Sequence, residues 1–80
     1  MTASLEHKRV AILATDGFEQ SELEEPLKAL RAAGADVVVV SPEKGRIQGM
    51  KHADKGDQFD VDLELEEADA REFDALVLPG

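Results

Sequence analysis

A short, uniformly apolar segment at residues 10–14 is the strongest constraint on how this 80-residue chain can fold. Its residues do not alternate with polar ones, which is typical of a strand covered on both faces of a parallel sheet. An acidic turn and an amphipathic segment follow it at once, at residues 15–33. In an open α/β sheet, ligands and catalytic groups collect where such a strand passes into a helix. The corner after Ala14 is therefore the first place to look for a site.

The amphipathic segment predicts one main helix over about residues 19–33. Leu23, Leu27 and Leu30 recur at helical spacing, and Gly34 supplies a C-terminal stop.

Two features at the start of this helix are informative. Ser21 and Glu24 have the spacing of a capping box, which accounts for part of the acidic cluster. Pro26 lacks an N–H, so the carbonyl of Glu22 loses its usual helical partner unless Pro26 falls in the first turn. We therefore expect a non-ideal backbone near Glu22.

Further elements follow along the chain. Residues 36–40 and 74–78 have the pattern of buried strands, and residues 63–73 contain the apolar spacing of a short helix. Residues 45–49 and 58–62 alternate and are rich in turn residues, which predicts a hairpin standing off the main sheet. The expected apolar contacts of the short helix are Leu65, Ala68 and Phe73.

These elements predict an α/β fold with three parallel strands. A strand, a helix and a strand with short connections form a right-handed βαβ unit, so the strands pair in parallel. In the order 2-1-3, the tips of the first and third strands lie side by side, and Glu22 and Gly80 then converge. A parallel sheet needs layers on both faces, and this chain offers one good helix. We therefore expect residues 1–80 to be the N-terminal part of a single domain whose remainder lies beyond Gly80.

Composition excludes several classes of function. The formal net charge of −9 argues against binding to nucleic acid and to anionic membranes. The sequence has no cysteine, so it contains neither a disulfide nor a thiol nucleophile. It has no apolar run long enough to span a bilayer and no secretion signal in its first nine residues, so the expected location is the cytoplasm.

The motifs of three common α/β functions are missing or incomplete. No G-x-G-x-x-G or P-loop follows the first strand, and the acidic turn would repel phosphate. A phospho-receiver domain would carry an aspartate where this chain has Pro79 and Gly80. His52 lies among several aspartates, but their spacing fits neither a zinc site nor a calcium loop. We expect neither a metal nor a cofactor.

Glu19 and Glu22 lie three residues apart, on one side of the predicted helix start. They have two interpretations. Acids at a helix N-terminus complement the helix dipole without any further role. Alternatively, Glu22 lies half-buried at the strand edge, where its pKa is raised and it shares a proton with a reacting group. The residues alone leave both open.

Several motifs occur here in the order known from one family. They are Asp16-Gly17-Phe18-Glu19 with Ser21-Glu22-Leu23-x-x-Pro26, Gly45-x-Ile47-x-Gly49, Lys55-Gly56-Asp57-x-Phe59-x-Val61-Asp62, and Phe73-Asp74-Ala75-Leu76-Val77-Leu78-Pro79-Gly80. With the first strand, they resemble the start of the PfpI-type intracellular protease and general stress protein family. That family is akin to the Parkinson-associated protein deglycase, in the class I glutamine amidotransferase-like superfamily.

The resemblance implies a flavodoxin-like three-layer sandwich, usually dimeric, with a reactive cysteine that a histidine follows. It implies that Glu22 hydrogen-bonds this cysteine and favours its thiolate or oxidised forms, with Glu19 in support. It also implies that Gly80 is the first glycine of the oxyanion turn. The cysteine, the histidine and the second glycine would lie beyond Gly80, so residues 1–80 cannot perform the family's chemistry alone.

Our leading hypothesis is a cytosolic stress-response protein, a cysteine-dependent hydrolase that acts on small carbonyl compounds, glycated groups or peptide bonds. Its partners would be the rest of its own domain, a second copy of the chain and this substrate. The alternatives are a non-catalytic acidic interaction module and a cysteine-oxidation sensor without turnover, both on the same fold.

Overall fold

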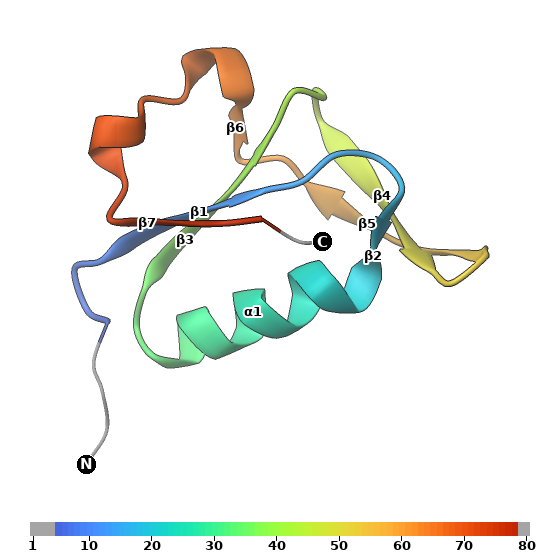
Figure 1. Cartoon of the computed structure of the whole chain (residues 1–80), viewed down its shortest axis with the longest axis horizontal. Helices are drawn as coiled ribbons and strands as arrows, with labels where there is room; N and C mark the ends of the chain where they lie inside the picture. Colours follow the sequence, from blue (N-terminus) through green and yellow to red (C-terminus); the bar gives the residue numbers. More distant parts are fainter. Residues whose placement is uncertain (1–4, 79–80) are drawn as a thin grey trace.

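The computed structural model describes residues 5–78 and contains a four-stranded parallel sheet. The sheet has the order β6-β3-β1-β7, formed by Leu63–Glu64, Asp36–Ser41, Arg9–Leu13 and Ala75–Val77 (Figure 1). The expected 2-1-3 order of the three main strands is confirmed, and β6 adds a short fourth strand. Because β1 pairs in parallel with β3 and β7, the carboxyl ends of all three strands lie at the same edge of the sheet.

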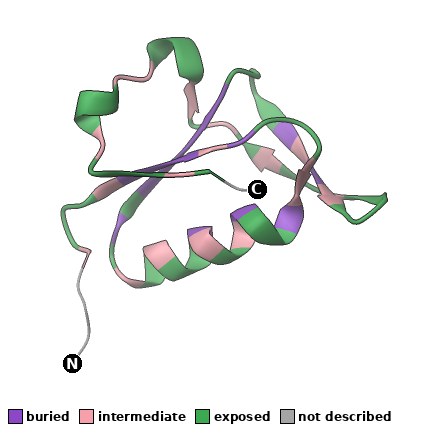
Figure 2. Ribbon diagram, in the orientation of Figure 1, coloured by how far each residue is buried: buried purple, intermediate pink, exposed green. Residues whose placement is uncertain are grey.

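Helix α1 (Gln20–Ala32) covers one face of this sheet. Its Leu23 and Leu27 are buried in one core cluster with alternate residues of β1 and β3, and Figure 2 shows the most buried part of the molecule there. The helix begins earlier than the expected capping box requires. Its N-cap is Glu19, which makes no side-chain cap hydrogen bond, so Ser21 lies inside the first turn and the capping box was wrong.

Pro26 lies inside α1, beyond its first turn. The carbonyl of Glu22 therefore has no N–H partner at position 26, as the sequence led us to expect. The other end of the helix is closed by Gly34, which has a φ of +95°.

Gly34→Ala is expected to destabilise the protein by about 1–2 kcal/mol, because alanine is strained at positive φ. The added Cβ would also lie 3.1 Å from Cγ of Glu6. The midpoint of urea unfolding measures the effect, and Ala33→Gly at the neighbouring C-cap position is the control. If Gly34→Ala leaves the midpoint unchanged, this turn does not hold its left-handed conformation.

A second, three-stranded sheet projects beside the first (Figure 1). It has the order β2-β4-β5, formed by Phe18–Glu19, Arg46–Lys51 and Asp54–Asp60. Strands β4 and β5 are the predicted off-sheet hairpin, which is confirmed. The rings of Phe18 and Phe59 pack edge to face, with centroids 5.4 Å apart, and so help to fix the hairpin against the start of α1.

The short helix expected in residues 63–73 was wrong. After β6, the chain forms two separate 3-10 turns, Leu65–Glu67 and Ala70–Glu72. Asp69 interrupts them, because its carboxylate accepts a hydrogen bond from the backbone N–H of Arg71 and caps the second turn. The Arg71 side chain also donates to this carboxylate, and both bonds lower the pKa of Asp69. Both residues belong to the surface, so the pair adds little to stability.

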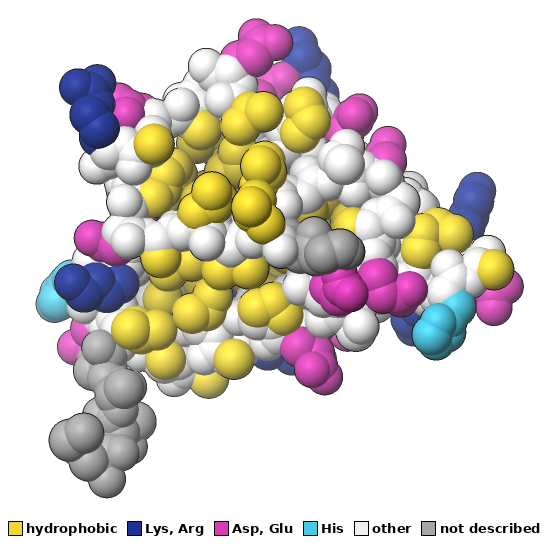
Figure 3. Space-filling view, in the orientation of Figure 1, with side chains coloured by type: hydrophobic (Ala, Val, Ile, Leu, Met, Phe, Trp, Pro, Cys, Tyr) yellow, Lys and Arg dark blue, Asp and Glu magenta, His cyan; other side chains and the backbone are white. Residues whose placement is uncertain are grey.

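The two turns leave much of the second sheet face open. A smaller buried cluster lies there, formed by Ala11, Val38 and Val40. Leu65, Leu76 and Leu78 are 45%, 60% and 64% exposed, and Figure 3 shows apolar side chains gathered on the side of the molecule that carries β7. Of the expected contacts in this segment, Ala68 and Phe73 pack on the cluster, whereas Leu65 is exposed. No helix among the described residues is long and apolar enough to cross a membrane.

Candidate functional site

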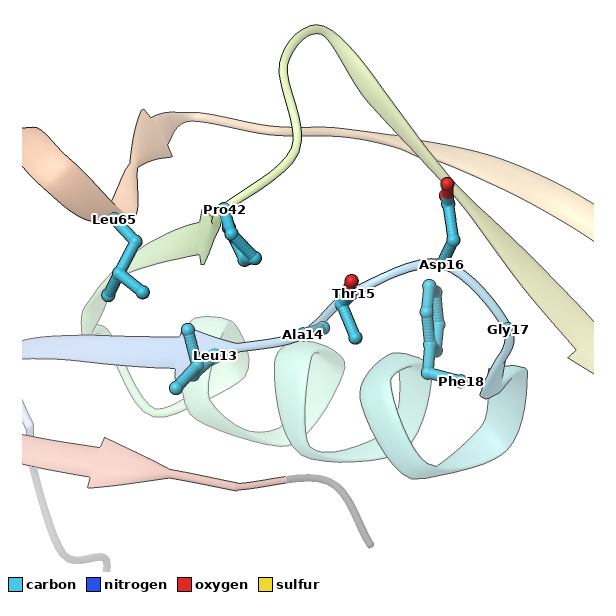
Figure 4. A pocket seen from close by; sticks show the side chains of 8 residues that line it. All are labelled: Leu13, Ala14, Thr15, Asp16, Gly17, Phe18, Pro42 and Leu65. Atoms are coloured by element: carbon cyan, nitrogen blue, oxygen red, sulfur yellow. The ribbon is translucent and has the colours of Figure 1, made fainter.

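The candidate site lies at the corner where β1 passes into α1. The backbone N–H of Ala14 donates to the carbonyl of Val40, which ties the corner to the end of β3. Gly17 turns the chain with a φ of +86°. A cavity of about 440 Å³ opens here, and Figure 4 shows its lining side chains. They are Leu13, Ala14, Thr15, Asp16, Gly17, Phe18, Pro42 and Leu65.

Asp16, although it lines this cavity, is held by the hairpin. Its carboxylate accepts a hydrogen bond of 2.9 Å from the backbone N–H of Gln48, and the N–H of Gly17 donates to the carbonyl of Gln48. These two bonds join the corner to β4. Asp16 therefore serves chiefly to fix the loop.

Glu19 also contacts the hairpin. It precedes α1 in an extended conformation, with φ −71° and ψ 121°. Its carboxylate oxygens lie 3.1 and 3.3 Å from the backbone nitrogen of His52, which donates to them. Because Glu19 is not in the helix, the spacing rule that places it beside Glu22 does not apply. Its direct contact is structural, and a supporting role in chemistry stays a prediction.

Glu22 differs from both of these acids. It lies in the first turn of α1 and is exposed, whereas the functional interpretation of the sequence had it half-buried. Within residues 5–78, neither a backbone N–H nor a side chain donates to its carboxylate. It is thus the acid of this corner that the fold has left unused.

Gly80, the expected donor of the oxyanion turn, lies outside the described residues, as does Pro79. Its convergence with Glu22 stays a prediction. The described part of the chain shows that β7 runs parallel to β1, with Val77 paired to Ile12. Strand β7 therefore leads toward the edge of the sheet at which the corner lies.

Sequence reasoning missed Gln20, which is only 3% exposed. Its side-chain amide exchanges two hydrogen bonds with Asp57 of β5. A signal for this role was present in the sequence. Gln20 falls on the same helical stripe as Leu23 and Leu27, so a polar residue at this position predicts a buried amide with a dedicated partner.

The aspartates around His52 form no metal centre in the part of the chain that the structure describes. No three His, Cys, Asp or Glu side chains there could hold a metal ion. His52 itself lies in the turn between β4 and β5 with a φ of 58°, and its N–H contacts Glu19. Its side chain is exposed.

The corner supplies a carboxyl group and a cavity, but no thiol. A carboxyl group can tune a neighbouring thiol or exchange a proton with a reacting group. The sequence of residues 1–80 contains no cysteine. A thiol for such chemistry is therefore not among residues 1–80.

Comparison with known proteins identifies relatives that are similar in sequence to this chain. Deglycase TK1284 of Thermococcus kodakarensis is 49% identical over 72 residues, which are 90% of this chain and 41% of the relative. General stress protein 18 of Bacillus subtilis is 36% identical over 73 residues, with 91% and 41% covered. The chain thus spans about two fifths of the length of these curated relatives.

The fold has close structural neighbours too. The ThiJ/PfpI domain protein of Brachyspira murdochii superposes with a TM-score of 0.77 and 31% identity, over 94% of this chain and 41% of that protein. The model of the DJ-1/PfpI family matches residues 8–80, which include both sheets, α1 and the acidic corner. A match over nearly the whole sequence, together with the same fold, shows that the chain belongs to the DJ-1/PfpI family.

Proposed function

We propose that these residues supply the acidic half of a cysteine-dependent active site with hydrolase or deglycase activity. Glu22 acts on a cysteine that follows Gly80, and the Gly80 N–H contributes to the oxyanion site. The name of Deglycase TK1284 favours glycated groups as substrates, and the name of General stress protein 18 favours a role in stress. Small carbonyl compounds are the further substrate class that the resemblance to the family suggests. The proposal includes a homodimer in the cytoplasm, which rests on the resemblance to the family.

One observation carries this proposal: Glu22 is the unused carboxyl group of the corner. Asp16 and Glu19 each accept a hydrogen bond from the hairpin backbone, whereas Glu22 is exposed at the start of α1. This carboxyl group lies in the first turn of α1, at the carboxyl edge of a parallel sheet, which is where catalytic groups collect in open α/β folds.

The chemistry follows from the position of this acid. A protonated carboxyl group that donates a hydrogen bond to a thiolate stabilises the thiolate and lowers the pKa of the thiol. The thiolate is the form that attacks an electrophilic carbonyl carbon. Backbone N–H groups then stabilise the negative charge that develops on the carbonyl oxygen.

Glu22→Ala tests the proposal in the intact protein. A lost hydrogen bond to a charged group is worth about 1.5–3 kcal/mol, which raises the thiol pKa by about 1–2 units. Alkylation of the cysteine by iodoacetamide, followed from pH 4 to 10, measures this pKa. Glu25→Ala is the matched control, because Glu25 is an exposed glutamate of the same helix. If both variants titrate like the parent, Glu22 is only a helix-end acid.

Three assays on the same protein separate the functions that remain open. Consumption of an α-oxoaldehyde or removal of a glycated group supports the deglycase, and cleavage of a peptide supports a protease. Oxidation of the cysteine by peroxide without any turnover supports a sensor. A protein with no cysteine beyond Gly80 would leave the non-catalytic module as the better account.

A further inference from the structure

The side chain of Gln20 joins the start of α1 to the hairpin through a closed pair of hydrogen bonds. Its Oε1 accepts a bond of 2.8 Å from the backbone N–H of Asp57, and its Nε2 donates a bond of 2.9 Å to Asp57 Oδ2. Nε2 also lies 3.4 Å from a carboxylate oxygen of Glu24. Because an N–H can only donate and a carboxylate can only accept, one orientation of the amide satisfies all three contacts.

The hairpin is shaped to receive this amide. A Cβ at Gly56 would collide with Oε1 of Gln20, and a Cβ at Gly49 would lie 3.3 Å from Cβ of Gln20. The two glycines therefore leave the space that the glutamine occupies. Gln48 ties these two positions together, because its Nε2 donates to the carbonyls of Gly49 and Gly56. A buried glutamine with a shaped recess and full hydrogen bonding holds one conformation.

This contact acts on the part of α1 that carries Glu22. Gln20 is the first residue of the helix and Glu22 the third. Residues of an α-helix are separated by about 100° of rotation, so Glu22 projects about 200° around the helix from Gln20. With Gln20 fixed on the hairpin, Glu22 is directed to the opposite side of the helix.

The helix itself holds this turn less firmly than usual. Pro26 has no N–H, so the hydrogen bond that would tie the carbonyl of Glu22 to the second turn is missing. The side chain of the N-cap residue, Glu19, makes no capping hydrogen bond to the helix either. The contacts of Gln20 and Glu19 with the hairpin therefore supply the restraint that the helix backbone lacks.

We propose that the two hydrogen bonds between Gln20 and Asp57 form a clamp that fixes the rotation of the first turn of α1 and so directs Glu22 at its reaction partner. This inference rests on the proposed function, because it takes the partner to be the active-site cysteine. Gln20 is then a positioning residue, and the hairpin is part of the active-site framework although it lies outside the main sheet.

Gln20→Met in the intact protein is the first test. Methionine keeps the length of the side chain but forms neither hydrogen bond with Asp57. The thiol pKa should rise, as in Glu22→Ala, by up to about one unit. At pH values below this pKa, the rate of cysteine alkylation should therefore fall about threefold to tenfold. In a Glu22→Ala background, Gln20→Met should change the rate less than about twofold, because coupled residues are not additive.

A swapped pair restores the clamp and serves as the rescue. Gln20→Glu removes the donor and places a carboxylate against Asp57, so this variant should also slow alkylation. Adding Asp57→Asn places the amide on β5 and the carboxylate on α1. The side-chain hydrogen bond can then re-form with donor and acceptor exchanged, and the net charge equals that of the parent. The double variant should return to the parent's profile. Val38→Ala, in the buried cluster on the other sheet face, is a control for destabilisation alone and should leave the profile unchanged.

Each outcome has one meaning. If Glu22→Ala shifts the profile but folded Gln20→Met does not, the clamp is refuted and the proposed function stands. If neither shifts it, the role of Glu22 fails, and the clamp as a positioning device fails with it. Should Gln20→Met not fold, the swapped pair decides: a folded double variant that keeps the slow profile of Gln20→Glu overturns the clamp.

Discussion

Leu23→Ala is expected to destabilise the protein by about 3–4 kcal/mol, the usual effect of removing a fully buried leucine. Leu23 is 0% exposed and lies in the core cluster between α1 and the sheet. It is also the residue next to Glu22, so its packing helps to hold the first turn of α1 on the core. A loss of this size is a large part of the 5–15 kcal/mol that stabilises a typical domain.

Urea unfolding measures this change in the free energy of unfolding, with one dependence of that free energy on urea concentration fitted to both proteins. Lys28→Ala is the matched control, because Lys28 is exposed on the same helix and its replacement should change stability by less than about 0.5 kcal/mol. A loss below about 1 kcal/mol for Leu23→Ala would mean that the neighbouring side chains fill the space left by the leucine. The stability of α1 would then not depend on the packing of Leu23.

Gly56→Ala is expected to destabilise the protein by about 2–3 kcal/mol, as in other overpacked sites. Its φ is not positive, so the effect is purely steric: the new Cβ would collide with Oε1 of Gln20. Alanine in a strand gains about 0.5–1 kcal/mol over glycine through backbone entropy. The collision exceeds this gain, because Gln20 is buried and its amide is held by Asp57 on two sides.

A double-mutant cycle checks this explanation. Gln20→Ala removes the group that the new Cβ would strike, so Gly56→Ala should cost about 1–2 kcal/mol less in that background than in the parent. Lys55→Ala, at the exposed position next to Gly56, is the control for a change in β5 itself. Equal effects in the two backgrounds would show that Gln20 does not occupy the recess.

The sheet and the main helix could be read from the sequence because they follow from local patterns. The apolar runs at β1 and β3 and the leucine stripe of α1 each indicate one element, and short connections force parallel pairing. The start of the helix was predicted to within about one residue, but the capping box of Ser21 and Glu24 was wrong, because the N-cap is Glu19. A cap depends on the conformation of one residue, and a four-residue motif does not fix it.

The second half of the chain was harder to predict. Residues 63–73 have apolar residues at helical spacing but form β6 and two 3-10 turns. The pairing of Leu63 with Val40 and the cap at Asp69 decide this conformation. Both compete with a helix that is too short to be stable by its own propensity.

By itself, the sequence determined the α/β class, the strand order, the position of the acidic corner and the absence of a cysteine from residues 1–80. These properties depend on residue type and on spacing along the chain, which the sequence states directly. Only the tertiary structure decided which acids of the corner accept hydrogen bonds within the fold. Asp16 and Glu19 accept hydrogen bonds from the hairpin and Glu22 does not, because strands about thirty residues away in sequence fold back beside the corner. The same long-range contact buries Gln20 against Asp57, and no pattern within α1 alone could show that partner.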